Sequence, residues 1–179
     1  MSTNLNNTNV EIILPNYNSA PFLEETIHSI IGQTFENWKL TIVDGHSNIE
    51  TQNILKKYIN HPKVNIIRLK KRKRAGFCRN LAIRKSKSEY IAFIDSDDIW
   101  EKNKLFKQLS FMIENKYYFT YTNYQPFKAK DKIEKLEEIK PEKSFTFEKF
   151  IRNTSIATST MIIKRNSIGV IKFSNTKIC

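Results

Sequence analysis

Short apolar runs alternate with amphipathic helical patterns along the first hundred residues. Runs of five or six mostly apolar residues have the length of buried strands, and they lie at Val10–Leu14, Trp38–Val43, Val64–Leu69 and Tyr90–Ile94. The segments between them repeat apolar residues at helical spacing, and these are Ala20–Gln33, Ile49–Ile59 and Gly76–Lys85. Because strands and helices that alternate in this way form βαβ units, we predict an α/β, Rossmann-like fold with a mostly parallel sheet and helices on both faces.

The pattern continues less regularly after residue 100. It predicts a helix and two further strands, at Lys102–Ile113, Tyr117–Tyr124 and Ala157–Lys164. Lys128–Lys143 carries charges of both signs, and we expect an exposed loop or a short surface helix there. Thr146–Ile151 has the length of one or two helical turns, and Gly169–Phe173 is a weak strand-like run.

We expect one domain over residues 10–179, preceded by a polar, disordered tail at residues 1–9. Within this domain, residues 10–100 form the nucleotide-binding type of half-domain that βαβ units build. Residues 101–179 form a partial second half. Its C-terminal part is expected to be incomplete, because Arg165–Cys179 shows no clear helical pattern.

The composition is that of one soluble globular domain, with 40% hydrophobic and 27% charged residues among 179. No apolar run approaches the roughly 20 residues of a membrane-spanning helix. Met1–Asn9 lacks both the basic start and the apolar stretch of a signal peptide. Two cysteines, Cys78 and Cys179, are too few for a disulfide framework or a zinc site. These features predict a reducing, cytoplasmic location.

The net charge of +12 is concentrated in one part of the chain. Residues 56–87, here called the basic block, hold 13 Lys or Arg and no Asp or Glu, so the remainder sums to −1. Such a block is typical of a surface that binds an anion: a diphosphate, a nucleic acid or an acidic membrane face. A solvated basic surface without any partner is the plain alternative.

Polar and acidic residues follow three of the predicted strands. They are Pro15 to Asn18, Asp44, and Asp95 to Asp98. Because ligands bind beyond the carboxyl ends of the strands in open parallel sheets, we expect these residues to meet at one edge. No strand is followed by a Gly-x-Gly-x-x-Gly or Walker-type loop, which argues against dinucleotide enzymes and P-loop NTPases.

The run Asp95-Ser96-Asp97-Asp98 is a candidate metal site. Carboxylates this close repel one another unless a cation lies among them, and their oxygens suit Mg²⁺ or Mn²⁺ bound to substrate phosphates. Such an ion acts as a Lewis acid on a leaving diphosphate. The alternative is that these residues only cap the following helix. Their position after an apolar strand, with Asp44 expected nearby, favours the metal.

Three further side chains have open roles at this edge. Asp44 either accepts hydrogen bonds from a base or ribose or closes a turn with Gly45. Tyr17 either stacks on a base or packs beneath its loop. Arg79 either pairs with phosphate through its planar guanidinium or faces solvent.

Two longer stretches together resemble the family 2 glycosyltransferases with the GT-A fold. The first, VEIILPNYNSAPFLEETIHSIIGQTFENWKLTIVDGHS, contains a P-x-Y-N turn and an S-I-x-x-Q-T-F helix end. The second, AGFCRNLAIRKSKSEYIAFIDSDDIWEKNKLFKQ, ends in the acidic motif and a Trp-containing helix start. The match covers most of residues 10–164 in order.

The resemblance implies an enzyme that transfers a sugar from a nucleotide-diphosphate donor, with inversion, to a cell-surface glycan or lipid-linked acceptor. The donor-binding residues that it implies are Pro15, Tyr17, Asn18, Asp44, Arg79, Asp95 and Asp97, and the ligands of a Mn²⁺ or Mg²⁺ ion are Asp97 and Asp98. Lipid-linked acceptors lie at membranes, so the resemblance is compatible with docking of the basic block on the inner membrane face.

The chain departs from the family pattern at three places. The family's usual second Asp after the second strand is Gly45, and the Gly before the fourth strand is Ser88. Family members also continue to a Glu-Asp pair that supplies the general base for the acceptor hydroxyl, whereas no acidic residue follows Glu148 here. We therefore expect a truncated member whose general base lies beyond Cys179. General-base catalysis contributes ~10²–10⁴-fold, so donor binding would survive while transfer is crippled.

Two other interpretations compete with the enzyme. The basic block, Lys56–Lys87, could dock the domain on an anionic membrane or on RNA without catalysis, and nucleic acid is the less favoured of these partners. The chain could also be a non-functional fragment, in which an exposed strand edge and apolar surface favour aggregation.

Overall fold

The computed structural model describes Leu5 and residues 7–129, 133–146, 148, 155–169 and 172–174. Strands and helices alternate along its first part: β1 (Val10–Asn16), α1 (Ala20–Ile31), β2 (Trp38–Asp44), α2 (Ile49–Lys56), β3 (Val64–Arg68), α3 (Ala75–Lys85), β4 (Tyr90–Phe93) and α4 (Lys104–Glu114). Every element predicted up to residue 113 is present, with each end within three residues of its expected position.

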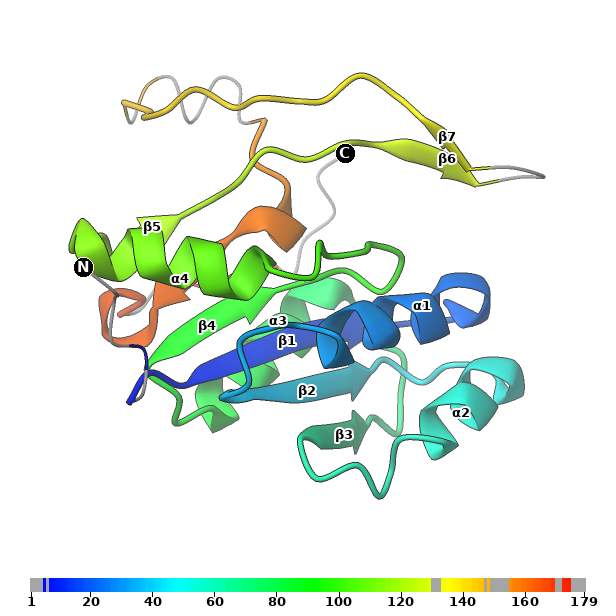
Figure 1. Cartoon of the computed structure of the whole chain (residues 1–179). Helices are drawn as coiled ribbons and strands as arrows, with labels where there is room; N and C mark the ends of the chain where they lie inside the picture. The colour runs from blue at the N-terminus through cyan, green and yellow to red at the C-terminus, as the bar shows by residue number, and fades with distance from the viewer. Residues whose placement is uncertain are drawn as a thin grey trace.

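The sheet is mostly parallel, as predicted. Two short strands of the second part, β5 (Phe119–Thr120) and β8 (Ile162–Lys164), complete six strands in the order β3-β2-β1-β4-β8-β5. β1 pairs in parallel with β2 and β4, and β2 pairs in parallel with β3. Only β8 runs antiparallel to its neighbours, β4 and β5. The carboxyl ends of β1, β2 and β4 therefore meet at one edge of the sheet (Figure 1).

The two faces of the sheet bury separate apolar clusters. Successive side chains of β1 point to opposite faces, so Ile12 packs with residues of α1, α2 and α4, whereas Ile13 packs with Cys78 and Ala82 of α3. Figure 1 shows the same division, with α1, α2 and α4 in front of the sheet and α3 behind it. Helices on both faces are thus confirmed. Because helices pack on both faces of the sheet, the carboxyl ends of its strands are held in place. Any site at this edge is therefore built on a rigid frame.

The two strands predicted after residue 113 are shorter than expected. Only Phe119–Thr120 of the predicted strand Tyr117–Tyr124 lies in the sheet, because its partner β8 has just three residues. The predicted strand Ala157–Lys164 begins instead as a 3₁₀ turn, η1 (Thr158–Thr160). Here the Thr160 hydroxyl donates to the Ala157 carbonyl at 2.6 Å, and such local hydroxyl bonds compete with strand pairing.

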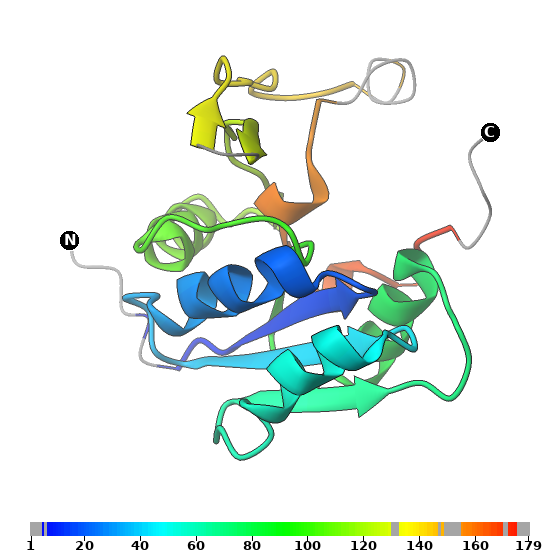
Figure 2. The same cartoon turned by 90° about the vertical axis from the view of Figure 1, so that its right-hand side faces the viewer.

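The expectation of an exposed loop or a short surface helix at Lys128–Lys143 is wrong where two strands form and holds for residues 136–138 and 140–142, which have no regular structure. In its described part the chain forms a hairpin of β6 (Phe127–Ala129) and β7 (Ile133–Lys135), extended by an antiparallel bridge between Tyr124 and Ile139. After β5 the chain rises away from the sheet and forms this hairpin (Figures 1 and 2). No buried face imposes an alternating apolar pattern on such a hairpin, so hydropathy did not predict it.

Three expectations fall partly outside the described residues. They concern the helical turns at Thr146–Ile151, the run Gly169–Phe173 and the tail at residues 1–9. A second 3₁₀ turn, η2 (Arg165–Ser167), precedes the second of these. In the tail, the Asn9 side chain accepts a hydrogen bond from the Glu89 backbone at 2.7 Å and Thr8 accepts one from the side chain of Asn37 at 2.7 Å. Residues 8 and 9 are therefore held against the sheet.

Gln33 fastens the loop between β4 and α4 to the end of α1. Its side-chain nitrogen donates to the Glu101 carbonyl at 2.8 Å, and its oxygen accepts from the Leu105 backbone at 3.0 Å. Gln33 is 6% exposed, so both bonds are shielded from water. These bonds hold the loop that contains the acidic run in place against the end of α1.

Candidate functional site

Two clefts meet at the carboxyl edge of the parallel strands. The small cleft has a volume of about 250 Å³, and the large cleft one of about 950 Å³. The predicted site residues that line the small cleft are Pro15, Tyr17, Arg79, Asp95 and Asp97. Asp97 and Asp98 line the large cleft. Asp97 is therefore shared, and it marks the point where occupants of the two clefts would come together.

The basic block supplies one wall of the small cleft. The Arg72 guanidinium carbon lies 4.4 Å from the centroid of the Tyr17 ring, and Lys73 lines the cleft beside it. Tyr17 is 38% exposed, so it does not pack beneath its loop as one interpretation had it. An aromatic ring and two cations at the mouth of a cleft favour an anionic ligand with a flat apolar part.

Arg79 does not face solvent. Its Nη2 atom donates to the Asp95 carboxylate, and its side chain is only 11% exposed. Its Nε atom is buried and has no hydrogen-bond partner among the described residues. The guanidinium carbon lies 5.1 Å from the centroid of the Phe173 ring, on the side of α3. Arg79 thus holds Asp95 in place and still has an unsatisfied donor beside the small cleft.

Asp44 and Asn18 reach the same edge but line neither cleft. Asp44 is 1% exposed, and its carboxylate accepts from the Asn16 side chain at 2.7 Å and from the backbone and hydroxyl of Ser47. Asn18 has a left-handed backbone with φ of 51°, and its side-chain oxygen accepts from the Asn48 backbone at 2.7 Å. Both residues fasten the loops after β1 and β2 together, and their contact with a donor stays a prediction.

Gly45 brings the basic block onto the tip of β1. Its backbone nitrogen donates to the Asn16 carbonyl at 2.8 Å, and its carbonyl accepts from the Lys73 backbone at 3.4 Å. A Cβ atom at this position would lie 2.8 Å from the Lys73 carbonyl oxygen. That approach explains why the chain has no room for the second Asp of the family pattern here.

We predict that Gly45→Ala moves the loop that carries Arg72 and Lys73 and weakens nucleotide binding about threefold to tenfold, because overpacking of this kind costs about 1–3 kcal/mol. Calorimetric titration with a nucleoside diphosphate measures the change. Gly32→Ala is the matched control, because its new Cβ would lie 3.3 Å from the His28 carbonyl and far from this loop. Equal affinity in Gly45→Ala and the unchanged chain would show that the close approach is not needed.

Ser159 holds the acidic run in place from the second part of the chain. Its hydroxyl donates to the Asp98 carboxylate and accepts from the Asp95 backbone at 2.9 Å, while its carbonyl accepts from the Trp100 indole at 2.9 Å. Burial raises the pKa of Asp98, the nearby charges of Asp95 and Asp97 raise it further, and the Ser159 hydrogen bond lowers it. The acidic run does not cap α4, whose N-cap residue is Asn103.

A divalent cation fits this acidic run only together with a ligand. Within the described part of the chain, no group of three or more His, Cys, Asp or Glu side chains is arranged to hold a metal ion. Asp95 is paired with Arg79, which leaves Asp97 and Asp98 as available carboxylates. Mg²⁺ is commonly held by one or two carboxylates together with substrate phosphates. Burial is the main cause of the raised pKa of Asp98, and a bound ion would stabilise the charged form that burial disfavours.

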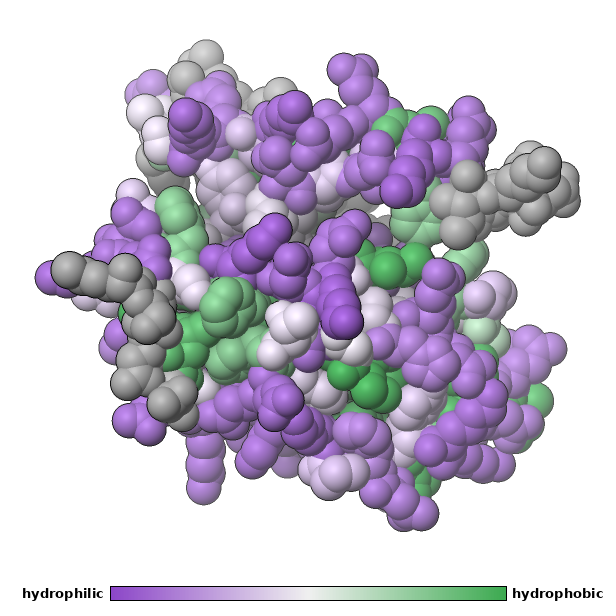
Figure 3. Space-filling view, viewed as in Figure 1, coloured by the Kyte–Doolittle hydropathy of each residue, from purple (hydrophilic) through white to green (hydrophobic). Residues whose placement is uncertain are grey.

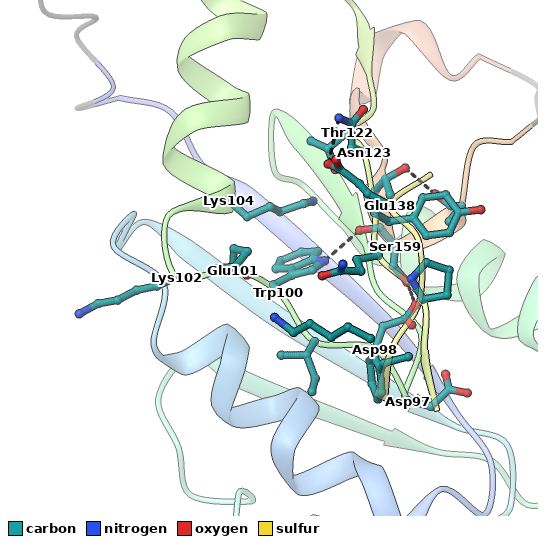
Figure 4. Close-up of a pocket in the computed structure, with 18 of the residues that line it drawn as sticks. Asp97, Asp98, Trp100, Glu101, Lys102, Lys104, Thr122, Asn123, Glu138 and Ser159 are labelled. Carbon is teal, nitrogen blue, oxygen red and sulfur yellow. Dashed lines mark hydrogen bonds between the residues drawn. The ribbon is translucent and has the colours of Figure 1, made fainter. Parts of the chain in front are cut away.

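The large cleft has a rigid floor and a roof made by the second part of the chain. The floor includes Trp100 and Lys104, and the roof includes Thr122, Asn123 and Glu138 (Figure 4). Trp100 is 6% exposed and is fixed by its bond to Ser159. The sequence did not single out Ser159, Trp100 or Lys104 as site residues. The Trp in the second family-like stretch was the one available signal.

The remaining nucleophilic and titratable candidates have structural roles. Burial raises the pKa of the Cys78 thiol to about 11, and the Asp44 carboxylate adds to this effect, so Cys78 is a poor nucleophile although it lines the small cleft. His28 contacts the Tyr58 hydroxyl at 3.1 Å, and the His61 ring stacks on Trp38.

The visible surface is mostly hydrophilic. Figure 3 shows apolar side chains on this face as separate patches among hydrophilic ones. Phe106 and Phe111 of α4 are 49% and 53% exposed. Among the described residues, no helix has the length and apolar content required to cross a bilayer.

Residues 11–171 match the model of the family described as Glycosyl transferase family 2. The putative teichuronic acid biosynthesis glycosyltransferase TuaG of Bacillus subtilis is 34% identical over 169 residues, which is 94% of this chain and 67% of TuaG. The Escherichia coli enzyme WfgD, a UDP-Glc:alpha-D-GlcNAc-diphosphoundecaprenol beta-1,3-glucosyltransferase, is 31% identical over 92% of this chain and 63% of its own. The chain thus spans about two thirds of the length of these relatives.

The fold also matches a solved glycosyltransferase structure. Residues 1–349 of Staphylococcus aureus TarS in complex with UDP-GlcNAc superimpose with a TM-score of 0.68 and 21% identity. The match covers 90% of this chain and 46% of the TarS chain, and at this identity it shows the fold alone. The predicted GT-A fold is confirmed. The family match and the two relatives together show that this chain belongs to glycosyl transferase family 2.

Proposed function

We propose that the chain binds a uridine-diphosphate sugar in the small cleft and presents the sugar, at Asp97, to an acceptor in the large cleft. Together with a general base for the acceptor hydroxyl, this arrangement would support transfer with inversion at the anomeric carbon. The observation that carries this proposal is the position of Asp97, which lines both clefts. A group-transfer enzyme needs two such subsites that meet at one point, because the reacting atoms must approach to about 3–3.5 Å.

Charge and shape support a nucleoside diphosphate in the small cleft. Arg72 covers one face of the Tyr17 ring, so a base would stack on the opposite face, and Lys73 supplies a cation to a diphosphate in the cleft. Arg79 lines the same cleft and adds a further cation there. The nucleotide is taken to be UDP because WfgD uses UDP-Glc and TarS was solved with UDP-GlcNAc.

Asp97 and Asp98 are the residues that would hold a Mn²⁺ or Mg²⁺ ion in this enzyme. A bound ion would offset negative charge on the leaving diphosphate. Ser159 would keep the Asp98 carboxylate oriented toward it, and the Arg79–Asp95 pair would keep a third carboxylate out of its coordination. The described residues thus bind and orient the donor.

Calorimetric titration with UDP, with Mn²⁺ and then with excess chelator, tests this function. We expect one UDP site whose affinity falls at least about tenfold when the ion is removed, because carboxylates alone repel a diphosphate. ADP and GDP serve as competitors that contain the same diphosphate. A folded sample that binds no nucleoside diphosphate under any of these conditions would contradict the proposed function.

Docking on an anionic membrane is the second candidate, and the exposure of Lys70, Lys71 and Arg74 favours it. Each cation near an acidic surface contributes about 1 kcal/mol. We predict that a Lys70→Ala, Lys71→Ala double variant co-sediments at least tenfold less with vesicles that contain 30% phosphatidylserine, and that 0.5 M salt removes the difference. Sedimentation that is unchanged by the substitutions would exclude docking through this part of the basic block.

A further inference from the structure

The side-chain amine of Lys104 is buried and unpaired among the described residues. The proposed donor site does not supply a partner for it either. Its Nζ atom is closed to solvent and has no hydrogen-bond partner among the described residues. The amine lies 3.9 Å from the centroid of the Trp100 ring. Figure 4 shows the side chain extending over this ring from the start of α4 toward Thr122 and Asn123. Lys104 also lines the large cleft.

The ring alone does not compensate the charge of this amine. Contact with an aromatic face offsets only part of the cost of burying a cation, which reaches several kcal/mol. The effect is visible in the pKa of Lys104, which burial lowers to about 7. An anion that enters the cleft and displaces the atoms covering this amine would supply the missing partner and restore the charged form.

The acidic residues of the cleft do not serve as that partner. The Asp98 carboxylate is bound by Ser159, and the Glu138 carboxylate is bound by Lys140 and by the Asn123 side chain at 3.2 Å. Asp97 and Glu101 also line the cleft. In the described part of the chain, none of these four carboxylates is bound to the Lys104 amine. The described residues therefore supply no counter-ion for this amine.

We propose that Lys104 binds a phosphate group of the acceptor in the large cleft, on the far side of Asp97 from the donor. This inference rests on the proposed function, because that function assigns the large cleft to the acceptor. A compact ammonium with three donors binds phosphate as a point charge, and the cleft of about 950 Å³ has room for a sugar with a phosphate attached. The proposed acceptor class is thus a phosphate-linked glycan, either a glycosyl diphosphate or a phosphodiester polymer.

The two tryptophans of the chain give a direct readout of this subsite. Each indole N–H gives one signal in a proton–nitrogen correlation spectrum, and each ring has a lysine amine over it: Lys104 over Trp100 at 3.9 Å and Lys63 over Trp38 at 5.0 Å. With UDP bound in the small cleft at pH 6.5, inorganic phosphate is titrated into the full chain. We expect the Trp100 signal to shift with saturation and the Trp38 signal to stay in place.

Lys104→Met and Lys104→Gln should each raise the apparent Kd for phosphate at least tenfold. Lys102 is an exposed lysine of the same cleft, and Lys102→Met should leave this Kd within twofold.

Methyl diphosphate and dimethyl phosphate then distinguish the two acceptor types, and either order of affinity supports the proposal. Phosphate binding that survives both Lys104 variants, or that is weaker than binding of glucuronate, would overturn it. UDP affinity is measured on the same samples, so loss of UDP binding in the unchanged chain would count against the proposed function instead.

Discussion

Asp97→Asn should weaken Mn²⁺-dependent UDP binding about a hundredfold. Asp97 lines both clefts and, unlike Asp95, is not held in an ion pair with Arg79. Loss of one of the two proposed carboxylate ligands leaves the charge of the diphosphate poorly offset, and contributions of this kind are worth several kcal/mol. Asp97 is exposed, so the substitution leaves the core untouched. Calorimetric titration with UDP in the presence of Mn²⁺ gives the affinity.

The matched control for Asp97 is Glu101→Gln, which removes an exposed carboxylate from the same large cleft. We expect its UDP affinity to stay within about threefold of the unchanged chain, because screened surface charges contribute little. With excess chelator, Asp97→Asn and the unchanged chain should bind UDP equally weakly. A hundredfold loss in both variants would point to general electrostatics, and no loss in Asp97→Asn would remove Asp97 from the site.

Lys104→Met should raise the free energy of unfolding by about 2–4 kcal/mol at pH 6. The substitution replaces a buried, unpaired cation by an apolar side chain of similar length, and the effective cost of such a cation is several kcal/mol. Natural sites keep destabilising groups of this kind where function needs them. A higher free energy of unfolding in Lys104→Met would thus show that Lys104 lowers the stability of the unchanged chain. Urea denaturation followed by far-ultraviolet circular dichroism measures it.

The gain from Lys104→Met should shrink as the pH rises. Burial lowers the pKa of Lys104 from 10.5 to about 7, so between these values the unfolded chain binds a proton that the folded chain does not. The free energy of unfolding of the unchanged chain therefore rises with pH across this window. Below pH 7, the full cost of burying the charged Lys104 amine lowers its stability. Lys102→Met should change stability by less than about 0.5 kcal/mol. An equal effect of Lys104→Met at pH 6 and pH 9.5 would contradict the buried charge.

The first half of the fold follows from hydropathy because each element there has one buried side. Strand β1 is buried at every position and α1 along one stripe, so both patterns are clear in the sequence. The hairpin of β6 and β7 has no such buried side. The Thr160 hydroxyl of η1 bonds locally, so part of the predicted strand Ala157–Lys164 forms a 3₁₀ turn instead. Packing against a core, rather than local propensity, is what made elements predictable in this chain.

The candidate site was predictable where residues follow strands and hidden where they arrive from a distance. Tyr17 and Asp97 were found because both come after buried strands that pair with or neighbour one another. Ser159 reaches Asp98 across 61 residues, and nothing local marks it. Lys104 is one of 30 basic residues, and only its burial against Trp100 separates it from the others. Asp44 lies at the predicted edge of the sheet, but its carboxylate already accepts hydrogen bonds from Asn16 and Ser47.

Paramagnetic broadening by Mn²⁺ in the presence of UDP tests the central claim most directly, which is that the donor and its metal lie where the two clefts meet at Asp97. Amide signals of residues 95–98 should be lost first, followed by those of Asn16, Tyr17 and residues 72–79, with the signals of α2 unaffected. Broadening that is centred elsewhere in the chain, or absent although UDP binds, would contradict the placement of the metal and of the transferred sugar.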